Sequence, residues 1–261
     1  MILSSRRLKP IGIFDSGIGG LSILAEARRL MPNESFVYYG DFANAPYGDK
    51  TLEEIKQITL SVAHELSNIG IKSLVVACNT ATSAAIKDLR QEYDFPVIGT
   101  EPALKPAMMS GGTGQVLVMA TTATLHLDKY KQLMEKFGIK DRVIELPCIG
   151  LSTIIEENAS GSKQIEEYLR QLFYGINPKD VESVVLGCTH YGLIADDIRM
   201  QFPSSKIYDT NKGVSKRLKQ LLTENNLTSP AKTGSLDIKC SGDFKKHKLI
   251  NKILAGMEVN I

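Results

Sequence analysis

The sequence predicts an α/β fold made of two similar α/β domains, each with a mainly parallel sheet. Short apolar runs rich in β-branched residues alternate with segments of helical periodicity along the whole 261-residue chain, which is the pattern of parallel strands joined by helices. In addition, Ser73–Thr80 resembles Ser183–His190, and their cysteines lie 188 − 78 = 110 residues apart. An offset near half of the chain indicates that one α/β unit occurs twice.

The first predicted strand, Ile11–Phe14, stops at Asp15 and leads through a glycine-rich turn into a helix. That helix carries Ile23, Ala27 and Leu30 on one side, which is the spacing of a face that packs on a sheet.

A long second helix begins with a capping box, Thr51 followed by Glu54, in which each side chain satisfies a free backbone N–H of the other residue. Its predicted buried stripe is Ile55, Ile58, Val62, Leu66 and Ile69. The next strand, Ser73–Ala77, ends at Cys78. Further strands are predicted at Val97–Ile98, Val116–Met119, Val143–Ile144, Val184–Leu186 and Ile207–Tyr208, with helices in most of the gaps.

Composition and charge exclude several classes of protein. With 43% hydrophobic and 23% charged residues, the chain is too apolar to be disordered. A net charge of +2, with acidic and basic residues mixed, offers no basic stripe for a nucleic acid. The densest basic run, Phe244–Lys248, is interpreted as a solvated helix face. No apolar stretch reaches the roughly 20 residues that cross a bilayer, and no signal peptide is recognised, so we expect a cytoplasmic protein without a membrane partner.

The four cysteines require separate interpretations. They form no Cys-x-x-Cys pair, so we expect neither a disulfide framework nor a metal site. Cys78 and Cys188 each follow a predicted strand and precede a helix, and a helix N-terminus favours the thiolate. Two cysteines in matching contexts favour a catalytic role over the alternative of buried, inert thiols, which is the interpretation given to Cys148 and Cys240.

The turn Asp15–Gly20 is a second candidate for function. Glycines after a strand let backbone N–H groups approach an anion at a helix start. The glycine spacing differs from that of dinucleotide-binding folds, and a carboxylate is a sufficient ligand for such a turn. Two roles stay open for Asp15: handling a proton of a neighbouring group, or bonding to its own turn.

Three further residues are candidates for the site, and each also has a non-functional interpretation. Tyr47 lies in the predicted loop Asp41–Gly48, where a surface aromatic is the alternative. His190 lies two residues after a candidate thiol and suits a base, an acid or an anion ligand, with a structural histidine as the alternative. Glu156 lies on a predicted helix, and nothing local distinguishes it from a solvated glutamate.

These segments together resemble the glutamate racemase family. The resemblance spans essentially the whole chain and rests on the ordered segments Asp15–Gly20, Pro46–Gly48, Cys78–Thr82, Ala120–Thr124, Gly187–Tyr191 and Ser241–Asp243. It implies two similar α/β domains with the active site in the cleft between them, and no bound cofactor. We expect a first domain of residues 1–98 and 209–261, with Asp15 and Cys78, and a second of residues 99–208, with Glu156, Cys188 and His190.

The resemblance also implies a role for each matching residue. Cys78 is expected to take the α-proton from the D-enantiomer and Cys188 from the L-enantiomer, while Asp15, Glu156 and His190 have supporting acid/base roles. The implied substrate-binding residues are Asp15, Ser16, Pro46, Tyr47, Gly48, Cys78, Asn79, Thr80, Thr121, Thr124, Cys188, Thr189 and His190.

The expected function is interconversion of L- and D-glutamate, which supplies D-glutamate for peptidoglycan. Removing a proton from one face of a carbon and returning one to the other suits two opposed thiols, and closure of two domains would exclude water. An aspartate or broad-specificity acidic amino-acid racemase is the alternative, since one methylene is typically worth only ~1–3 kcal/mol. A non-catalytic binding protein, or a hydrolase or decarboxylase with one cysteine, would not need both thiols.

Glutamate is the expected partner, and a homodimer is left open. Four positions depart from the family's pattern: Asn44, where the family often has arginine, and Ile149, Thr153 and Gly192, where it often has proline. These departures concern the loops around the expected cleft more than the reaction itself.

Overall fold

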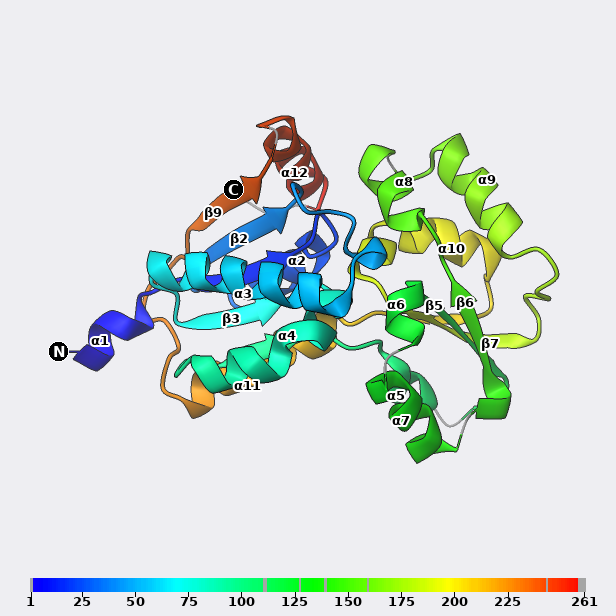
Figure 1. Cartoon of the computed structure of the whole chain (residues 1–261), viewed down its shortest axis with the longest axis horizontal. Coiled ribbons are helices and arrows are strands. Elements are labelled where there is room, and N and C mark those ends of the chain that lie inside the picture. The colour runs from blue at the N-terminus through cyan, green and yellow to red at the C-terminus, as the bar shows by residue number, and fades with distance from the viewer. Residues whose placement is uncertain are drawn as a thin grey trace. The chain divides into compact units, whose positions relative to one another are not determined.

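The computed structural model of the protein describes residues 2–109, 112–126, 128–138, 140–158, 160–242 and 244–257. The chain forms two compact units (Figure 1): unit 1 comprises Met1–Thr100 and Asn211–Ile261, and unit 2 comprises Glu101–Thr210. The chain therefore leaves unit 1 once and returns to it once. The boundaries expected from the sequence, after residues 98 and 208, lie close to these two crossings.

Unit 1 is built on a five-stranded sheet in which all neighbouring strands are parallel. In spatial order the strands are β4 (Val97–Gly99), β3 (Ser73–Val76), β1 (Ile11–Asp15), β2 (Phe36–Asp41) and β9 (Leu236–Ser241). The strands β1, β2 and β3 are buried along their whole length, which is why their sequences are mainly apolar runs. The edge strand β9 is mostly half-exposed, and its mixed sequence does not predict a strand.

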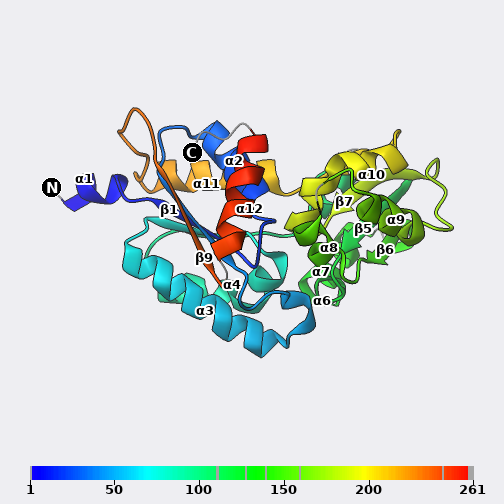
Figure 2. The ribbon, with the colours of Figure 1, turned by 90° about the horizontal axis from the view of Figure 1, so that it is seen from above.

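Helices cover both faces of this sheet (Figure 2). The helices α3 (Leu52–Ile69) and α4 (Asn79–Glu92) pack together on one face, and α2 (Leu21–Leu30) packs with α11 (Asn211–Glu224) on the other. The short α1 (Ile2–Arg7) precedes β1, and α12 (Phe244–Gly256) contacts β9 and α2. The basic run Phe244–Lys248 opens α12, and its side chains lie outside the described residues.

The long helix α3 confirms the predicted capping box and corrects its predicted stripe. Thr51 accepts from the backbone N of Glu54, and the Glu54 carboxylate accepts from the backbone N of Thr51. Ile69, predicted to be buried, is 40% exposed. The helix ends there, because Gly70 takes a left-handed conformation with φ of 90°, and Ile71 after the turn fills the core instead. The buried face of the helix is Ile55, Thr59, Val62, Ala63 and Leu66.

Unit 2 is built on a four-stranded parallel sheet. In spatial order the strands are β6 (Val143–Pro147), β5 (Gln115–Ala120), β7 (Val181–Leu186) and β8 (Lys206–Tyr208). On one side lie α5 (Leu104–Met108), α6 (Thr122–Leu125) and α7 (Asp128–Phe137), and on the other lie α8 (Leu151–Glu157), α9 (Lys163–Leu172) and α10 (Ala195–Gln201). Two 3₁₀ turns complete the unit, η2 (Lys140–Arg142) and η3 (Thr189–Ile194).

The two sheets repeat one topology. Unit 1 has the strand order 4-3-1-2 followed by β9, and unit 2 read in the same direction has the order 8-7-5-6. The predicted α/β class with parallel sheets and a repeated unit is confirmed, and every predicted strand is present. Among the described residues, no helix is both long enough and apolar enough to cross a membrane.

Candidate active site

Cys78 lies at the junction between β3 and α4 and is the N-cap residue of that helix. Its Sγ accepts hydrogen bonds from Ala81 N and Ser16 Oγ, each at 3.5 Å. Asn79 and Thr80 form the first turn of α4, and both are buried. Donors at the positive end of a 14-residue helix stabilise a thiolate more than a thiol, so this position suits an acid/base thiol.

The turn after β1 carries a second group of predicted site residues. Asp15 is fully buried, and its Oδ1 accepts a hydrogen bond from Gly17 N at 2.9 Å, which is the local turn bond considered from the sequence. Gly20 has no room for a side chain, since an added Cβ would lie 2.7 Å from Cβ of Asp15 and 3.0 Å from Cβ of Ala77. The glycine therefore lets α2 begin directly against the strand ends.

Tyr47 lies in the 3₁₀ turn η1 (Tyr47–Asp49) and is only 3% exposed, so the alternative of a surface aromatic is wrong. Its ring packs near that of Phe14, with centroids 6.3 Å apart, and its hydroxyl donates to Asp41 Oδ2 at 2.6 Å. Burial and this hydrogen bond raise the pKa of Tyr47 well above its usual value, so the phenol stays protonated. The flanking Pro46 and Gly48 are exposed.

Cys188 occupies the matching place in unit 2, after β7 and Gly187. A side chain at Gly187 would clash with β5, because an added Cβ would lie 2.8 Å from Cβ of Ala120. The turn that follows is the 3₁₀ turn η3, and the Cys188 side chain makes no capping hydrogen bond. The helix-start stabilisation expected for both thiols is therefore wrong for Cys188, because no α-helix begins there.

At Cys188 the groups next to the thiol are an imidazole and a carboxylate instead of the start of an α-helix. Its Sγ lies 3.8 Å from Nδ1 of His190, and Nε2 of His190 lies 3.0 Å from Oε1 of Glu156. His190 is 4% exposed and the Glu156 side chain 12% exposed, so the alternative of a solvated glutamate is wrong. A carboxylate at Nε2 keeps a proton on that nitrogen and leaves Nδ1 facing the thiol. This arrangement can accept the thiol proton and return it.

The predicted threonines of unit 2 follow the strands β5 and β7. Thr121 follows β5 and caps α6, with its Oγ1 accepting from Thr124 N at 3.2 Å and lying 3.0 Å from Thr124 Oγ1. Thr189 follows Cys188 and is 6% exposed. Small hydroxyl side chains at strand ends are suitable hydrogen-bond partners for carboxylates.

The other two cysteines lie in different surroundings. Cys148 follows β6 and is 3% exposed, and burial raises the pKa of its thiol to about 12. Cys240 lies on β9, and partial burial raises the pKa of its thiol. Both thiols therefore stay protonated near neutral pH, as expected for packing residues.

The positions that depart from the family's pattern lie in loops and at helix starts. Asn44 Nδ2 donates to both carboxylate oxygens of Asp41, at 3.1 and 3.0 Å. Ile149 is 74% exposed, Thr153 is exposed and Gly192 is half-buried. Sequence reasoning missed Asp41 as a candidate, although a carboxylate that ends a strand directly before a candidate loop is a usable signal.

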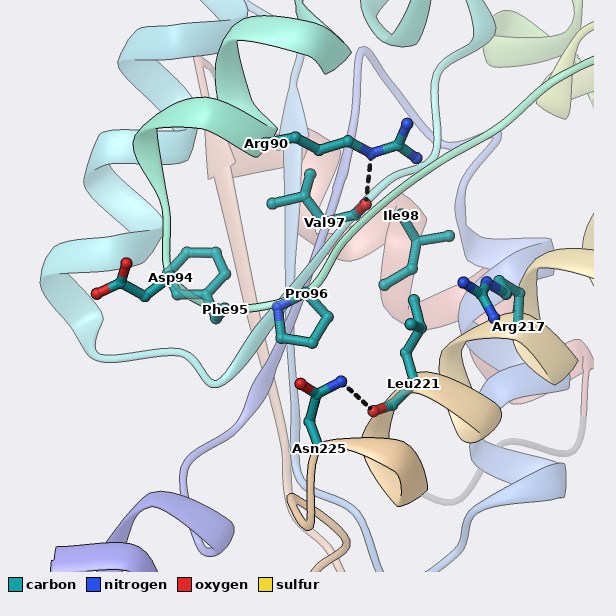
Figure 3. A pocket seen from close by; sticks show the side chains of 9 residues that line it. All are labelled: Arg90, Asp94, Phe95, Pro96, Val97, Ile98, Arg217, Leu221 and Asn225. Atoms are coloured by element: carbon teal, nitrogen blue, oxygen red, sulfur yellow. Dashed lines mark hydrogen bonds between the residues drawn. The ribbon is translucent and has the colours of Figure 1, made fainter.

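A cavity of about 460 Å³ in unit 1 is separate from these residues (Figure 3). It lies beside β4, with Arg90 of α4 and Arg217 of α11 among its lining residues, and it includes none of the predicted site residues. Arg90 Nε donates to the carbonyl of Val97 at 3.1 Å. Among the residues that the structure describes, no group of three or more His, Cys, Asp or Glu side chains could hold a metal ion.

Each unit thus brings part of the predicted site together at the carboxyl ends of its strands, where ligands bind in open α/β sheets. Unit 1 joins Ser16 to Cys78, and unit 2 joins Cys188, His190 and Glu156 in a chain. One thiol has fixed donors and the other has a titratable partner. Both arrangements suit proton transfer by sulfur.

Comparison with known proteins gives consistent matches over most of the chain. Residues 21–214, which include Cys78 and Cys188, match the model of the family described as Asp/Glu/hydantoin racemase. A glutamate racemase of Clostridium perfringens is 46% identical over 248 residues, which are 94% of this chain and 95% of that protein. One of Clostridium botulinum is 43% identical over 253 residues, 95% of this chain and 98% of that protein.

Solved structures agree. Escherichia coli glutamate racemase in complex with L-glutamate and the activator UDP-MurNAc-Ala has a TM-score of 0.83 and 27% identity, and the match covers 95% of each chain. Glutamate racemase of Francisella tularensis in complex with D-glutamate has a TM-score of 0.81 and 28% identity, covering 96% of this chain and 94% of that one. With the matching strand-end thiols of its two units, this chain belongs to the Asp/Glu/hydantoin racemase family.

Proposed function

We propose that this protein is a glutamate racemase that interconverts L- and D-glutamate without a cofactor. The observation that carries the proposal is the pair of strand-end thiols, Cys78 and Cys188, each with its own hydrogen-bond partner. The identity of 46% to a glutamate racemase over 94% of the chain supports the choice of substrate.

In the proposed reaction, one thiolate removes the α-proton and the other thiol donates a proton to the opposite face. Cys188 takes the proton from L-glutamate and Cys78 takes it from D-glutamate. His190 receives the proton of Cys188 and Glu156 holds the imidazole, while Ser16 and the first turn of α4 support Cys78 as a thiolate. A positioned acid or base contributes about 10²–10⁴ in rate.

The substrate offers two carboxylates and one ammonium group. We propose that hydroxyl and amide side chains at the strand ends hold the carboxylates, and that Asp15 serves the proton chemistry beside Cys78. Tyr47 contributes through the loop Pro46–Gly48. The proposed binding residues are Ser16, Pro46, Tyr47, Gly48, Asn79, Thr80, Thr121, Thr124 and Thr189.

A direct assay tests this function. The purified protein, freed of small molecules, is given each enantiomer of glutamate and of aspartate, and conversion is followed by circular dichroism and chiral chromatography. We expect glutamate to racemise in both directions without pyridoxal phosphate, metal or nucleotide, with kcat/KM for glutamate above that for aspartate. A ratio at or below unity would move the assignment to an aspartate or broad-specificity racemase, and activity that needs pyridoxal phosphate or is abolished by a chelator would contradict the two-thiol reaction.

The proposed role in the cell is supply of D-glutamate for peptidoglycan, from a cytoplasmic protein that forms a homodimer. A strain without the protein should need added D-glutamate for growth. Cell fractionation tests the location, and sedimentation of the purified protein tests the homodimer. Normal growth of the null strain, or a monomer at all concentrations, would overturn the corresponding part.

A further inference from the structure

Asp41 holds the loop that carries Tyr47. It ends β2, is 1% exposed, and accepts hydrogen bonds from the side chains of two residues in the following loop. Asn44 Nδ2 donates to both of its oxygens, and Tyr47 Oη donates to Oδ2 at 2.6 Å. A buried carboxylate is costly unless donors satisfy it, so the loop must keep this conformation as long as the carboxylate stays buried.

A residue from the C-terminal strand completes this set of donors. Ser241, the last residue of β9, donates from Oγ to Asp41 Oδ1 at 2.5 Å and accepts from Ala43 N at 2.9 Å. Asp41 and Ser241 are 200 positions apart in the chain. Ser241 lies beyond residues 21–214, the part that matches the family model, so the tie brings the C-terminal segment to the proposed substrate loop.

The loop that Asp41 holds also contacts the surroundings of Cys78. The Tyr47 ring belongs to one hydrophobic core with Phe14 and Cys78, and the turn η1 contacts α4, whose N-cap is Cys78. The hydroxyl proton of Tyr47 is committed to Asp41, so the side chain acts as an anchor that fixes the backbone of the loop.

We propose that Asp41 is a positioning residue that preorganises the substrate loop, residues 42–48, and that Ser241 of the C-terminal strand is its second anchor. The inference rests on the proposed function for its kinetic consequence. Asp41 acts through Tyr47 and its flanking residues and does not touch the reacting carbon. When Asp41 is replaced, the loop is no longer ordered before substrate binds. The free energy needed to order it then reduces the observed affinity for substrate.

The kinetic test compares Asp41→Asn, Ser241→Ala and the matched control Asp237→Asn, which removes an exposed carboxylate on the same C-terminal strand. Asn keeps the size of Asp41 but has one oxygen instead of two, so three neutral donors compete for it. We expect KM for glutamate to rise about 10-fold in Asp41→Asn and about 3-fold in Ser241→Ala, in keeping with charged and neutral hydrogen bonds, with kcat changed less than about 3-fold. Asp237→Asn should match the wild type.

Two further measurements separate positioning from loss of fold. Tyr47→Phe added to Asp41→Asn should raise KM no further, because the Tyr47 hydroxyl acts only through Asp41. In the ligand-free protein, backbone hydrogen exchange should quicken in residues 42–48 of Asp41→Asn and Ser241→Ala, and stay unchanged in β1.

Each outcome decides a separate question. Unchanged KM in both anchor variants, additive effects of the two substitutions, or unchanged exchange of the loop would overturn the positioning role. If Asp41→Asn fails to fold, Ser241→Ala carries the same test alone. If the wild type does not racemise glutamate, the proposed function fails, while the exchange measurement still tests the tie.

Discussion

The two halves of the candidate site place a cysteine at the same point of the same topology and surround it differently. In the orders 4-3-1-2 and 8-7-5-6, both thiols follow the second strand listed. Cys78 caps an α-helix and receives a serine hydroxyl. Cys188 precedes a 3₁₀ turn and faces an imidazole that a carboxylate holds.

The difference shows that the repeated topology determines where each thiol lies. The residues that surround the thiol in space determine its proton chemistry. Around Cys78 the described donors, Ser16 and the backbone of α4, keep their protons, so they stabilise sulfur charge by fixed dipoles. Around Cys188 the partner is itself a base. We therefore expect the two half-sites to respond differently when their supporting groups are removed.

The largest effect is expected from the thiols themselves. Replacing Cys78 or Cys188 by Ser keeps the shape but gives a far less acidic group, so racemisation should fall by ~10²–10⁴, or roughly 3 to 5 kcal/mol in the barrier. Initial rates with each enantiomer measure this, and Cys240→Ser is the control with a modest effect. Near-normal turnover of either catalytic variant would remove that thiol from the reaction.

A smaller and asymmetric effect is expected from His190→Asn. The value of kcat/KM should fall about 10- to 100-fold, the worth of a hydrogen bond to a charged group, and equally in both directions because two enantiomers have the same free energy. The asymmetry appears with glutamate deuterated at Cα. The primary isotope effect should grow for the L-enantiomer and shrink for the D-enantiomer, since bond breaking by Cys188 becomes the slower step. Equal growth for both would contradict the assignment of Cys188 to the L-enantiomer.

The mirror experiment in unit 1 is Ser16→Ala, which removes one donor to Cys78. The loss in kcat/KM should be about 2- to 10-fold, as for a neutral hydrogen bond. Here the isotope effect should grow for D-glutamate only. The comparison between the half-sites breaks down if this variant and His190→Asn shift the isotope effects in the same direction.

Cys148 provides an inert reference, since it also follows a strand but has its pKa raised to about 12 by burial. Above its usual value of 9.0, the unfolded chain loses this proton while the folded protein keeps it. Stability contributed by the neutral thiol is therefore complete below pH 9 and declines toward pH 12, by up to about 1.4 kcal/mol per pH unit. Urea unfolding of wild type and Cys148→Ala should show a stability difference that shrinks between pH 9 and 10.5. A constant difference would mean that Cys148 ionises normally in the folded protein.

The fold was predictable because central strands such as β1, β3, β5 and β7 are almost entirely buried and read as apolar runs. Strand β9 shows the limit: it lies at the sheet edge and is mostly half-exposed, so no periodic signal marks it. Ile69 shows another, since spacing along a helix does not reveal where a glycine turns the chain away from the core.

The candidate site was predictable to the extent that its groups follow strands in the sequence. The bond between His190 and Glu156 joins residues 34 positions apart, and that between Asp41 and Ser241 joins residues 200 apart. Such contacts depend on strand order, which the local sequence does not contain. The absence of an α-helix after Cys188 has the same origin, because the local pattern at both thiols is nearly the same.

The most direct test of the two-thiol account is racemisation in deuterated water, with the two pools of glutamate analysed at early times. Each thiol exchanges its proton with solvent, so a proton delivered by one thiol differs from the proton that the other removed. The account predicts deuterium at Cα of newly formed product, while unreacted substrate stays largely protiated, whichever enantiomer is supplied. Equal labelling of substrate and product, or return of the abstracted proton to the product, would show a single shared base and contradict the account.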